Sequence, residues 1–304
     1  MSSPRHFRTL LDLSKEELAE LLARAAVLRS ERSYTEEHPL RGKSIVILLE
    51  KASTRTRLSF EVGIHELGAL PLTLIAKDTQ LGRGEPLSDT ARMLSGYAHA
   101  VVYRTFGHEK IEELASHARI PVINGLSDTY HPCQLLADLM TVAAERDELK
   151  GTRVAWIGDG NNMAHSWILA AAQSELSLRL ACPEGYQPSP EVVAQARELG
   201  ADVEVVADPR EAAEGAHVVT TDVWASMGQE AENDARAKAF AGYQVDAALM
   251  GAAADEAIFL HCLPAHRGEE VAADVIDGPW SRVWDEAENR LHAQKALLEL
   301  LVTR

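Results

Sequence analysis

The sequence predicts an α/β protein of two lobes, each a parallel sheet flanked by helices, with the active site in the cleft between them. Three observations support this class. Apolar strand-like runs alternate with helical patterns through short connections, as in parallel α/β sheets. The alternation restarts after Lys150-Gly151. Polar clusters follow the predicted strands, and ligands of open α/β sheets bind beyond the carboxyl ends of strands.

The first lobe is predicted to span residues 1–148. A serine cap followed by an amphipathic pattern indicates a first helix over 14–31. Apolar runs indicate strands at 43–49, 71–76, 100–103 (ending at Arg104) and 121–124. The helical periodicity falls at 58–67, 87–97, 109–118 and 132–148.

The second lobe is predicted to span residues 149–285. Its strands are expected at 153–157, 178–181, 203–206, 218–220 and 257–261. Helices are expected at about 164–174 and 191–199. A last helix over about 286–301 is expected to bring residues 286–304 back onto the first lobe.

Composition narrows the class of function. The net charge of −16 over 304 residues disfavours nucleic acid or an anionic membrane as partner. The sequence has no run of 18 apolar residues, the length that spans a bilayer, so we expect no membrane span. The first residues do not have the pattern of a secretory signal either. Three widely spaced cysteines indicate reduced thiols and a cytoplasmic location. An anionic ligand would therefore need a local cationic cluster, because salt screens exposed charges beyond roughly 8 Å.

The stretch 53–57, Ser-Thr-Arg-Thr-Arg, follows an apolar strand and opens a helix. Unpaired N–H groups of a helix start bind phosphate, and arginine matches phosphate oxygens. We expect Arg55, in the first turn, to grip the phosphate while Arg57 braces the loop through Glu50 or Glu61. The alternative is an ordinary helix cap with surface arginines.

His131 and Gln134 flank a proline that suits the start of a helix. Both side chains could hydrogen-bond a carbonyl oxygen on which negative charge develops. A histidine alone would more often be a cap or a solvated residue, so this interpretation depends on the neighbouring amide.

The turn Gly158–Ala164 resembles a dinucleotide-binding turn, but Met163 replaces its third glycine. No ribose-binding acid follows the next strand either, so a nicotinamide cofactor is weakly indicated. Asn161 and Asn162 better suit contact with a polar small molecule.

Two later segments carry chemistry. Asp222, in the segment 222–230, could hold a substrate ammonium, although a plain surface loop is an equal alternative. His261 and Cys262 suggest zinc, but adjacent strand residues point to opposite faces and no second ligand pair is near. We expect no metal, and a Cys262 thiol tuned by nearby basic groups.

In this order, the segments resemble the aspartate/ornithine carbamoyltransferase family over almost the whole chain. The matching segments are 53–57, 103–104, 131–134, 222–228 and 261–264. The Asp-x-x-x-Ser-Met-Gly and His-Cys-Leu-Pro segments are similar to those of the ornithine-using members. The resemblance implies transfer of a carbamoyl group from carbamoyl phosphate to the δ-amine of L-ornithine, giving L-citrulline and phosphate, without a cofactor.

The resemblance also implies a role for each matching residue. The phosphate would be held by Ser53, Thr54, Arg55, Thr56 and Arg104, with Gln80 reaching in from a neighbouring subunit. The carbamoyl carbonyl would be polarised by His131, Gln134 and Thr56. Its NH2 group would meet Gln134 and the backbone carbonyls of Cys262 and Leu263, and Arg290 would complete this pocket. The amino-acid end of ornithine would be bound by Asn162, Asp222, Ser226 and Met227, with Cys262 near the δ-amine. The catalytic residues would be Arg104, His131 and Cys262.

A homotrimer, or an assembly of trimers, is implied by the resemblance alone. The sequence leaves open whether the reaction serves arginine biosynthesis or runs in the catabolic direction. Three other functions stay open: a nicotinamide dehydrogenase, a non-catalytic binding or regulatory protein, and an aspartate carbamoyltransferase, which is the nearest enzyme alternative.

Overall fold

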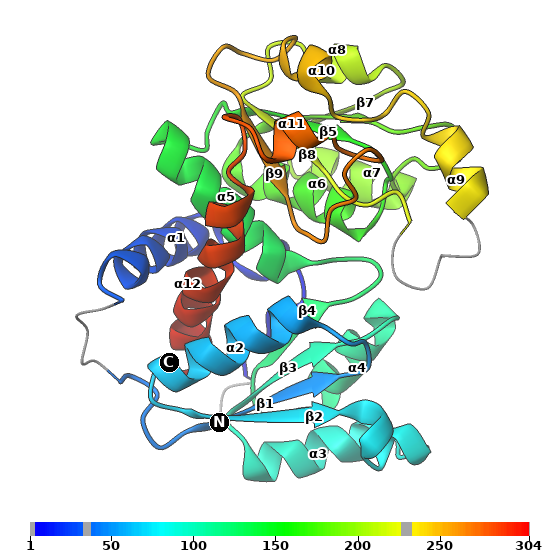
Figure 1. Cartoon of the computed structure of the whole chain (residues 1–304). Coiled ribbons are helices and arrows are strands. Elements are labelled where there is room, and N and C mark those ends of the chain that lie inside the picture. The colour runs from blue at the N-terminus through cyan, green and yellow to red at the C-terminus, as the bar shows by residue number, and fades with distance from the viewer. Residues whose placement is uncertain (1–3, 33–37, 226–232, 304) are drawn as a thin grey trace. The chain divides into compact units, whose positions relative to one another are not determined.

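The computed structural model describes residues 4–32, 38–225 and 233–303. It contains two parallel sheets of four and five strands, each flanked by helices (Figure 1). The α/β class with two parallel sheets, predicted from alternating strands and helices, is confirmed.

The chain divides into two compact units, and the first is discontinuous. Unit 1 comprises Met1–Met140 and Asn289–Arg304, and unit 2 comprises Thr141–Glu288. Both crossings between the units fall inside helices rather than in loops: α5 (Pro132–Arg146) and α12 (Val283–Val302). The last helix therefore contributes residues to both units.

The sheet of unit 1 is built from β1 (Ser44–Leu49), β2 (Leu70–Ile75), β3 (Ala100–Arg104) and β4 (Val122–Leu126). Its spatial order is β2-β1-β3-β4, so the direction of travel reverses between β1 and β3. Right-handed crossovers then place the helix before this reversal and the helices after it on opposite faces of the sheet. Accordingly α2 (Thr54–Glu66) covers one face, and α3 (Leu87–Tyr97) and α4 (His108–His117) cover the other (Figure 1).

The core of unit 1 follows from strand alternation. Side chains two residues apart share a face of the sheet, and Val46 and Leu48 of β1 join Val101 and Tyr103 of β3 beneath α3 and α4. The helices contribute Leu87, Ala91, Leu94, Ile111 and Leu114. Short 3₁₀ turns complete this unit: η1 (Leu10–Asp12), η2 (Ala76–Asp78) and η3 (Leu81–Arg83).

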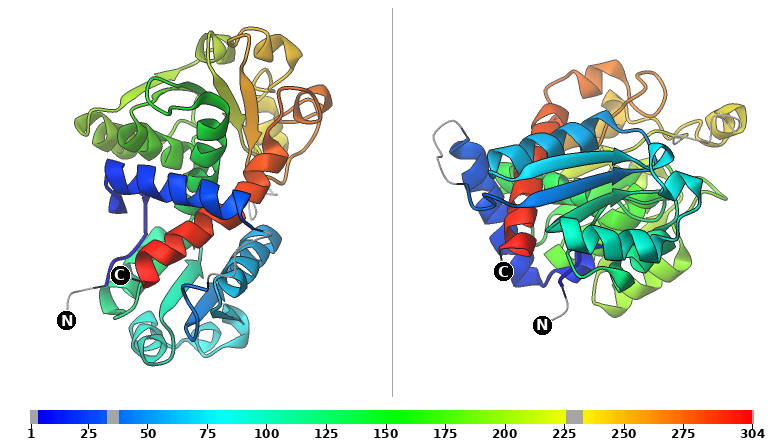
Figure 2. Two further views of the ribbon diagram at one scale, coloured as in Figure 1. Left: turned by 90° about the vertical axis from the view of Figure 1, so that its left-hand side faces the viewer. Right: turned by 90° about the horizontal axis from the view of Figure 1, so that it is seen from below.

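Helix α1 (Lys15–Ser30) lies beside the unit 1 portion of α12, as Figure 2 shows. Ser14 caps α1 by accepting a hydrogen bond from the Glu17 N–H at 3.2 Å. Arg24 pairs with Glu299 of α12 at 2.7 Å. These contacts hold the last helix within unit 1.

The sheet of unit 2 is built from β5 (Arg153–Ile157), β6 (Ser177–Ala181), β7 (Asp202–Val206), β8 (Val218–Thr221) and β9 (Ile258–His261). Its order, β7-β6-β5-β8-β9, reverses between β5 and β8. The helices wholly within this unit are α6 (Asn162–Ser174), α7 (Pro190–Glu198), α8 (Pro209–Ala213), α9 (Asn233–Ala239), α10 (Ala247–Met250) and α11 (Ala273–Ile276).

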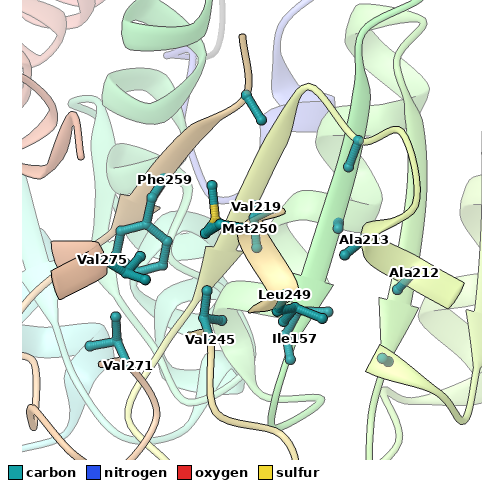
Figure 3. Packing of buried hydrophobic residues seen from close by; sticks show 14 of the residues in the cluster. Ile157, Ala212, Ala213, Val219, Val245, Leu249, Met250, Phe259, Val271 and Val275 are labelled. Carbon is teal, nitrogen blue, oxygen red and sulfur yellow. The ribbon is translucent and has the colours of Figure 1, made fainter. Parts of the chain in front are cut away.

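The core of unit 2 on the side of the short helices includes Phe259 of β9 (Figure 3). Val219 of β8, Met250 of α10 and Val275 of α11 belong to the same buried cluster. All four side chains are at most 2% exposed.

Two kinds of difference separate the predicted from the observed elements. Helix α2 begins at Thr54, four residues before the predicted start, because the Ser53 hydroxyl caps it. Its first turn consists of polar residues, so the apolar periodicity used for the prediction began only afterwards. Helices α8, α9, α10 and α11 were not predicted, because four to seven residues are too few to show a helical period. No helix in the described part of the chain is long and apolar enough to cross a membrane.

We expect Phe259→Ala to lower the free energy of unfolding of unit 2 by about 3–5 kcal/mol, because it leaves a cavity in a fully buried cluster. Urea denaturation followed by circular dichroism measures this change. Leu199→Ala, at a side chain 52% exposed, is the control and should cost no more than about 0.5 kcal/mol. Equal effects of the two substitutions would contradict the assignment of this core.

Candidate functional site

The first group of candidate residues lies where the strand order of unit 1 reverses. Ligands of open α/β sheets bind at such switch points, beyond the carboxyl ends of the strands. Ser53 and Thr56 follow β1, and Arg104 ends the adjacent strand β3. Parallel pairing places Leu49 of β1 opposite Arg104, so these groups meet at one edge of the sheet.

The N-terminus of α2 has the geometry of an anion-binding helix start. The Ser53 hydroxyl accepts a hydrogen bond from the Thr56 N–H at 3.2 Å. Thr54 and Arg55 occupy the first turn, whose N–H groups have no carbonyl partner within the helix. No acidic residue lies in this turn, so the partial positive charge of the helix end stays available to an anion.

The buried Thr56 hydroxyl joins two arginines. Arg104 Nη1 and Arg290 Nη2 each donate to Thr56 Oγ1, both at 3.2 Å. Arg290 Nη1 also donates to Gln134 Oε1 at 2.7 Å, and Gln134 Nε2 donates to Asp138 Oδ1 at 2.8 Å. The structure thus brings four predicted residues from α2, β3, α5 and α12 into one buried network.

His131 lies beside this network as a neutral ring. Arg290 Nη1 is 3.5 Å from its Nε2, and an arginine can only donate. Complete burial and the positive charges of Arg290, Arg104 and Arg55 hold the pKa of His131 well below its usual value. A neutral imidazole here can hydrogen-bond a substrate without adding a fourth positive charge.

Arg55 and Arg57 differ as the spacing predicts. Arg57 Nε pairs with Glu61 at 2.9 Å, one turn along α2, which is the bracing contact expected for it. Arg55 has no carboxylate partner among the described residues. Its charge reaches His131, whose pKa it lowers, so its guanidinium is the one available to a ligand.

Gln80 does not join this group. It is exposed and precedes η3, where its carbonyl accepts from the Arg83 and Glu85 N–H groups at 2.9 and 3.1 Å. Within residues 4–32, 38–225 and 233–303, its side chain has no hydrogen bond to the network. Its expected action from a neighbouring subunit stays a prediction.

The second group lies at the switch point of unit 2. Asp222 follows β8, and Asn161 follows the adjacent strand β5. Asn161 Nδ2 donates to Asp222 Oδ2 at 2.9 Å, and the Val223 N–H donates to Asp222 Oδ1 at 2.8 Å. The carboxylate is only 7% exposed, so its position is fixed by these donors rather than by solvent.

Asn161 is a residue whose contact the sequence did not assign. Its Oδ1 caps α6 by accepting from the Met163 N–H at 2.9 Å, which leaves its amide NH2 to donate to Asp222. The sequence indicates both asparagines as contacts for a polar small molecule, and the family resemblance implies Asn162 alone for the ornithine site. Asn162 begins α6, and its carbonyl accepts from Ser166. An asparagine directly before a helix often caps it, and this signal distinguishes the role of Asn161 from that of Asn162.

The expectation that His261 and Cys262 lie on opposite faces of a strand is wrong. A ring nitrogen of His261, the Cys262 sulfur and a carboxylate oxygen of Asp222 all lie within 4.8 Å of one another. Strand β9 ends at His261, so alternation does not continue into Cys262. The Cys262 thiol donates to Asp222 Oδ1 at 3.2 Å.

These three groups already have protein partners. His261 Nδ1 accepts from the Leu263 N–H at 2.9 Å, and its Nε2 lies 3.1 Å from Glu270. Leu263 has φ near +59°, a backbone conformation unusual for leucine, and thereby extends the segment away from strand geometry. His261, Cys262 and Asp222 thus each hydrogen-bond another protein group.

The turn after β5 packs closely against residues 186–188. The Gly160 N–H donates to the Tyr186 carbonyl at 2.8 Å, and a Cβ at Gly160 would lie 2.2 Å from the Pro188 nitrogen. The glycine is required by this close approach of the chain. Asp159 pairs with Arg236 at 2.7 Å. Ser226 and Met227, predicted to bind the amino-acid end of a substrate, lie outside the described residues.

Comparison with known proteins identifies both halves of the chain. Residues 5–144 match the family "Aspartate/ornithine carbamoyltransferase, carbamoyl-P binding domain", and residues 150–301 match "Aspartate/ornithine carbamoyltransferase, Asp/Orn binding domain". The chain is 54% identical to an ornithine carbamoyltransferase of Pelobacter propionicus, over 98% of each chain. It is also 54% identical to the anabolic ornithine carbamoyltransferase of Pseudomonas aeruginosa, over 99% of this chain and 98% of the other. The solved ornithine carbamoyltransferase of Pyrococcus furiosus has a TM-score of 0.94 at 47% identity, covering 99% of this chain and 97% of that one.

We expect His131 to make stability depend on pH below its ordinary pKa. The folded ring resists protonation, whereas the unfolded ring binds a proton with a pKa near 6.5. Acid therefore favours the unfolded state, and His131 alone should lower the free energy of unfolding by about 1 kcal/mol between pH 6.5 and 5.5. Urea denaturation at both pH values should show a smaller decrease for His131→Gln than for the unmodified protein. The same decrease in both proteins would show that His131 is not held neutral.

Proposed function

The chain belongs to the aspartate/ornithine carbamoyltransferase family, and we propose that it transfers the carbamoyl group of carbamoyl phosphate to the δ-amine of L-ornithine, giving L-citrulline and phosphate. The observation that carries this function is the buried Thr56 hydroxyl, which receives Arg104 and Arg290 at the open start of α2. Such a site combines an anion receptor with donors for a developing oxyanion.

The phosphate end of the donor is assigned to the first turn of α2. Ser53, Thr54 and Arg55 offer N–H groups, hydroxyls and a guanidinium. Among the described residues, no carboxylate pairs with the Arg55 guanidinium. Arg104 is directed toward the same turn through Thr56. Three nearby arginines (Arg55, Arg104 and Arg290) supply the local positive charge that a chain of net charge −16 requires.

The carbamoyl group is assigned to Thr56, His131, Gln134 and Arg290. The neutral δ-amine attacks the carbamoyl carbon, and a C–N bond forms while the carbonyl oxygen becomes an oxyanion. Arg104, Thr56 and His131 stabilise that charge. The C–O bond to phosphate then breaks, and the departing phosphate takes the proton of the attacking nitrogen. Orientation and fixed dipoles supply the rate, so no covalent enzyme intermediate is needed.

Ornithine is assigned to the residues of unit 2. The Asp222 carboxylate pairs with the α-ammonium, and Asn162, Ser226 and Met227 complete the amino-acid end. Cys262 and the carbonyls of Cys262 and Leu263 lie near the reacting nitrogens. The contacts from Asn161 and Cys262 to Asp222 support this assignment, because they orient both carboxylate oxygens. In this division, residues 1–148 bind carbamoyl phosphate, 149–285 bind ornithine, and 286–304 pack back on the first domain.

A homotrimer, alone or in an assembly of trimers, is supported by exposed apolar side chains in unit 1. They are Leu58 and Val62 of α2, Leu70 and Leu72 of β2, and Met93 and Tyr97 of α3. These side chains are 37–77% exposed, and β2 is an edge strand. An apolar edge strand favours burial against another chain. The exposure of Gln80 supports its action from a neighbouring subunit.

A cytoplasmic location and a biosynthetic role complete the proposal. All three cysteines are free thiols, as expected in a reducing compartment. The anabolic name of the Pseudomonas aeruginosa relative favours arginine biosynthesis over the catabolic direction.

An acceptor panel tests the function directly. Purified protein with carbamoyl phosphate should form a ureido product from ornithine, measured colorimetrically, at a rate at least a hundredfold above that from aspartate, acetylornithine or putrescine. A matched rate with aspartate would instead make the chain an aspartate carbamoyltransferase.

We expect Arg55→Ala to raise the KM for carbamoyl phosphate by about a hundredfold, because charge-assisted hydrogen bonds to the phosphate are lost. Arg57→Ala is the control. Its guanidinium pairs with Glu61 on the exposed side of α2, so its KM should stay within about threefold of the original. Steady-state kinetics at saturating ornithine measures both, and a larger effect from Arg57 would refute the choice of Arg55.

Asp222→Asn should raise the KM for ornithine by about a hundredfold, because it removes the charge that pairs with the ammonium. Binding of carbamoyl phosphate, measured by calorimetry, should be unchanged. Unaltered ornithine saturation would show that Asp222 does not bind this substrate.

A further inference from the structure

Glu50 is an acid where an anion-binding site would not be expected to have one. It directly follows β1 and precedes the residues 51–53 that lead into the start of α2. A carboxylate there repels phosphate unless it is neutralised. Its presence therefore needs a structural reason, which the contacts of both its oxygens supply.

Both carboxylate oxygens accept hydrogen bonds. Tyr103 donates its hydroxyl to Oε1. Thr105 Oγ1 and Lys110 Nζ donate to Oε2 at 2.7 and 2.9 Å. Burial alone would raise the pKa of the Glu50 carboxyl, but the hydrogen bonds from Lys110, Tyr103 and Thr105 outweigh it and hold the pKa below its ordinary value. Lys110 balances the charge.

The donors flank the phosphate-directed arginine. Tyr103 and Thr105 are the residues on either side of Arg104, and side chains two apart along a strand share one face. Arg104 itself points to the opposite face, toward Thr56 of α2. The Glu50 N–H also donates to the Arg104 carbonyl at 2.9 Å. Glu50 thus holds the strand at three consecutive residues.

The Arg104 side chain needs to be held in place because the regular pairing of β3 with β4 is interrupted beside it. The β3–β4 register shifts between Tyr103 and Arg104, whose partners are Asn124 and Leu126. Gly125 is left over as a bulge, and a Cβ there would lie 3.1 Å from Val102 Cγ1. Bulges re-aim side chains but weaken the local pairing. Beyond the bulge, β3 is held on its other side by Glu50.

We infer that Glu50 is a positioning residue for the phosphate site: by clamping Tyr103 and Thr105, it fixes the direction of the Arg104 guanidinium. This inference rests on the proposed function. A glutamine cannot fully replace it, because it carries no charge to pair with Lys110 and has one accepting oxygen where the carboxylate has two. The role differs from simple support of the fold, because it acts through Arg104 on the phosphate site and leaves the ornithine site unchanged.

The test is Glu50→Gln, with Glu112→Gln as the matched control. Glu112 also accepts from a cation of unit 1, Arg8 at 2.8 Å, but it lies away from the end of β3 on the exposed side of α4. Glu50→Gln should raise the KM for carbamoyl phosphate about tenfold and also lower kcat, because Arg104 stabilises the oxyanion as well, while the KM for ornithine changes less than twofold. Glu112→Gln should leave all three within twofold.

Calorimetry with inorganic phosphate separates this inference from the proposed reaction. The dissociation constant of phosphate should rise about tenfold in Glu50→Gln, whether or not ornithine is the acceptor. Lys110→Met should also weaken phosphate binding, because it exposes the Glu50 charge, and Glu50→Gln in that background should add less than it does alone. An unchanged phosphate affinity in Glu50→Gln would overturn the inference. So would a joint change of the KM for ornithine and of thermal stability, because that would indicate support of the fold only.

Discussion

Parallel strand pairing at the two reversals of strand order is the constraint on which the rest of the structure depends. Between β1 and β3, and again between β5 and β8, neighbouring strands send their chains to opposite faces of the sheet. The helices therefore diverge and leave the strand ends open. Ser53, Thr56 and Arg104 occupy one such end, and Asn161 and Asp222 occupy the other. Polar groups can gather there without interrupting either hydrophobic core.

The two ends solve opposite electrostatic problems. In unit 1, arginines are concentrated around a neutral histidine, and their mutual repulsion is moderated by the Thr56 hydroxyl and the Gln134 amide oxygen, which accept their hydrogen bonds. In unit 2, a buried carboxylate is stabilised by N–H and S–H donors that carry no charge. One end thus favours an anion and the other a cation, which is what the transfer of a carbamoyl group between a phosphate and an amine requires.

Much of this arrangement could be predicted from sequence, for physical reasons. Strands such as 100–104 and helices such as 87–97 have strong apolar periodicity, and switch-point residues follow strands directly. Contacts that depend on exact backbone placement could not be predicted. The Asn161–Asp222 bond depends on the pairing of β5 with β8. The meeting of Cys262 with His261 and Asp222 depends on β9 ending one residue earlier than alternation suggests. The contacts of Glu50 with Tyr103 and Thr105 depend on the pairing of β1 with β3, which no local signal near Tyr103 revealed.

The discontinuity of unit 1 has a consequence for synthesis of the protein on the ribosome. The strands of unit 1 can pair early, but Arg290 belongs to α12, which emerges only after the whole of unit 2. Until then, Thr56 and Gln134 lack the guanidinium that links them. A nascent chain that stops before α12 would thus hold an incomplete anion receptor, and full ligand affinity would report that α12 had been synthesised.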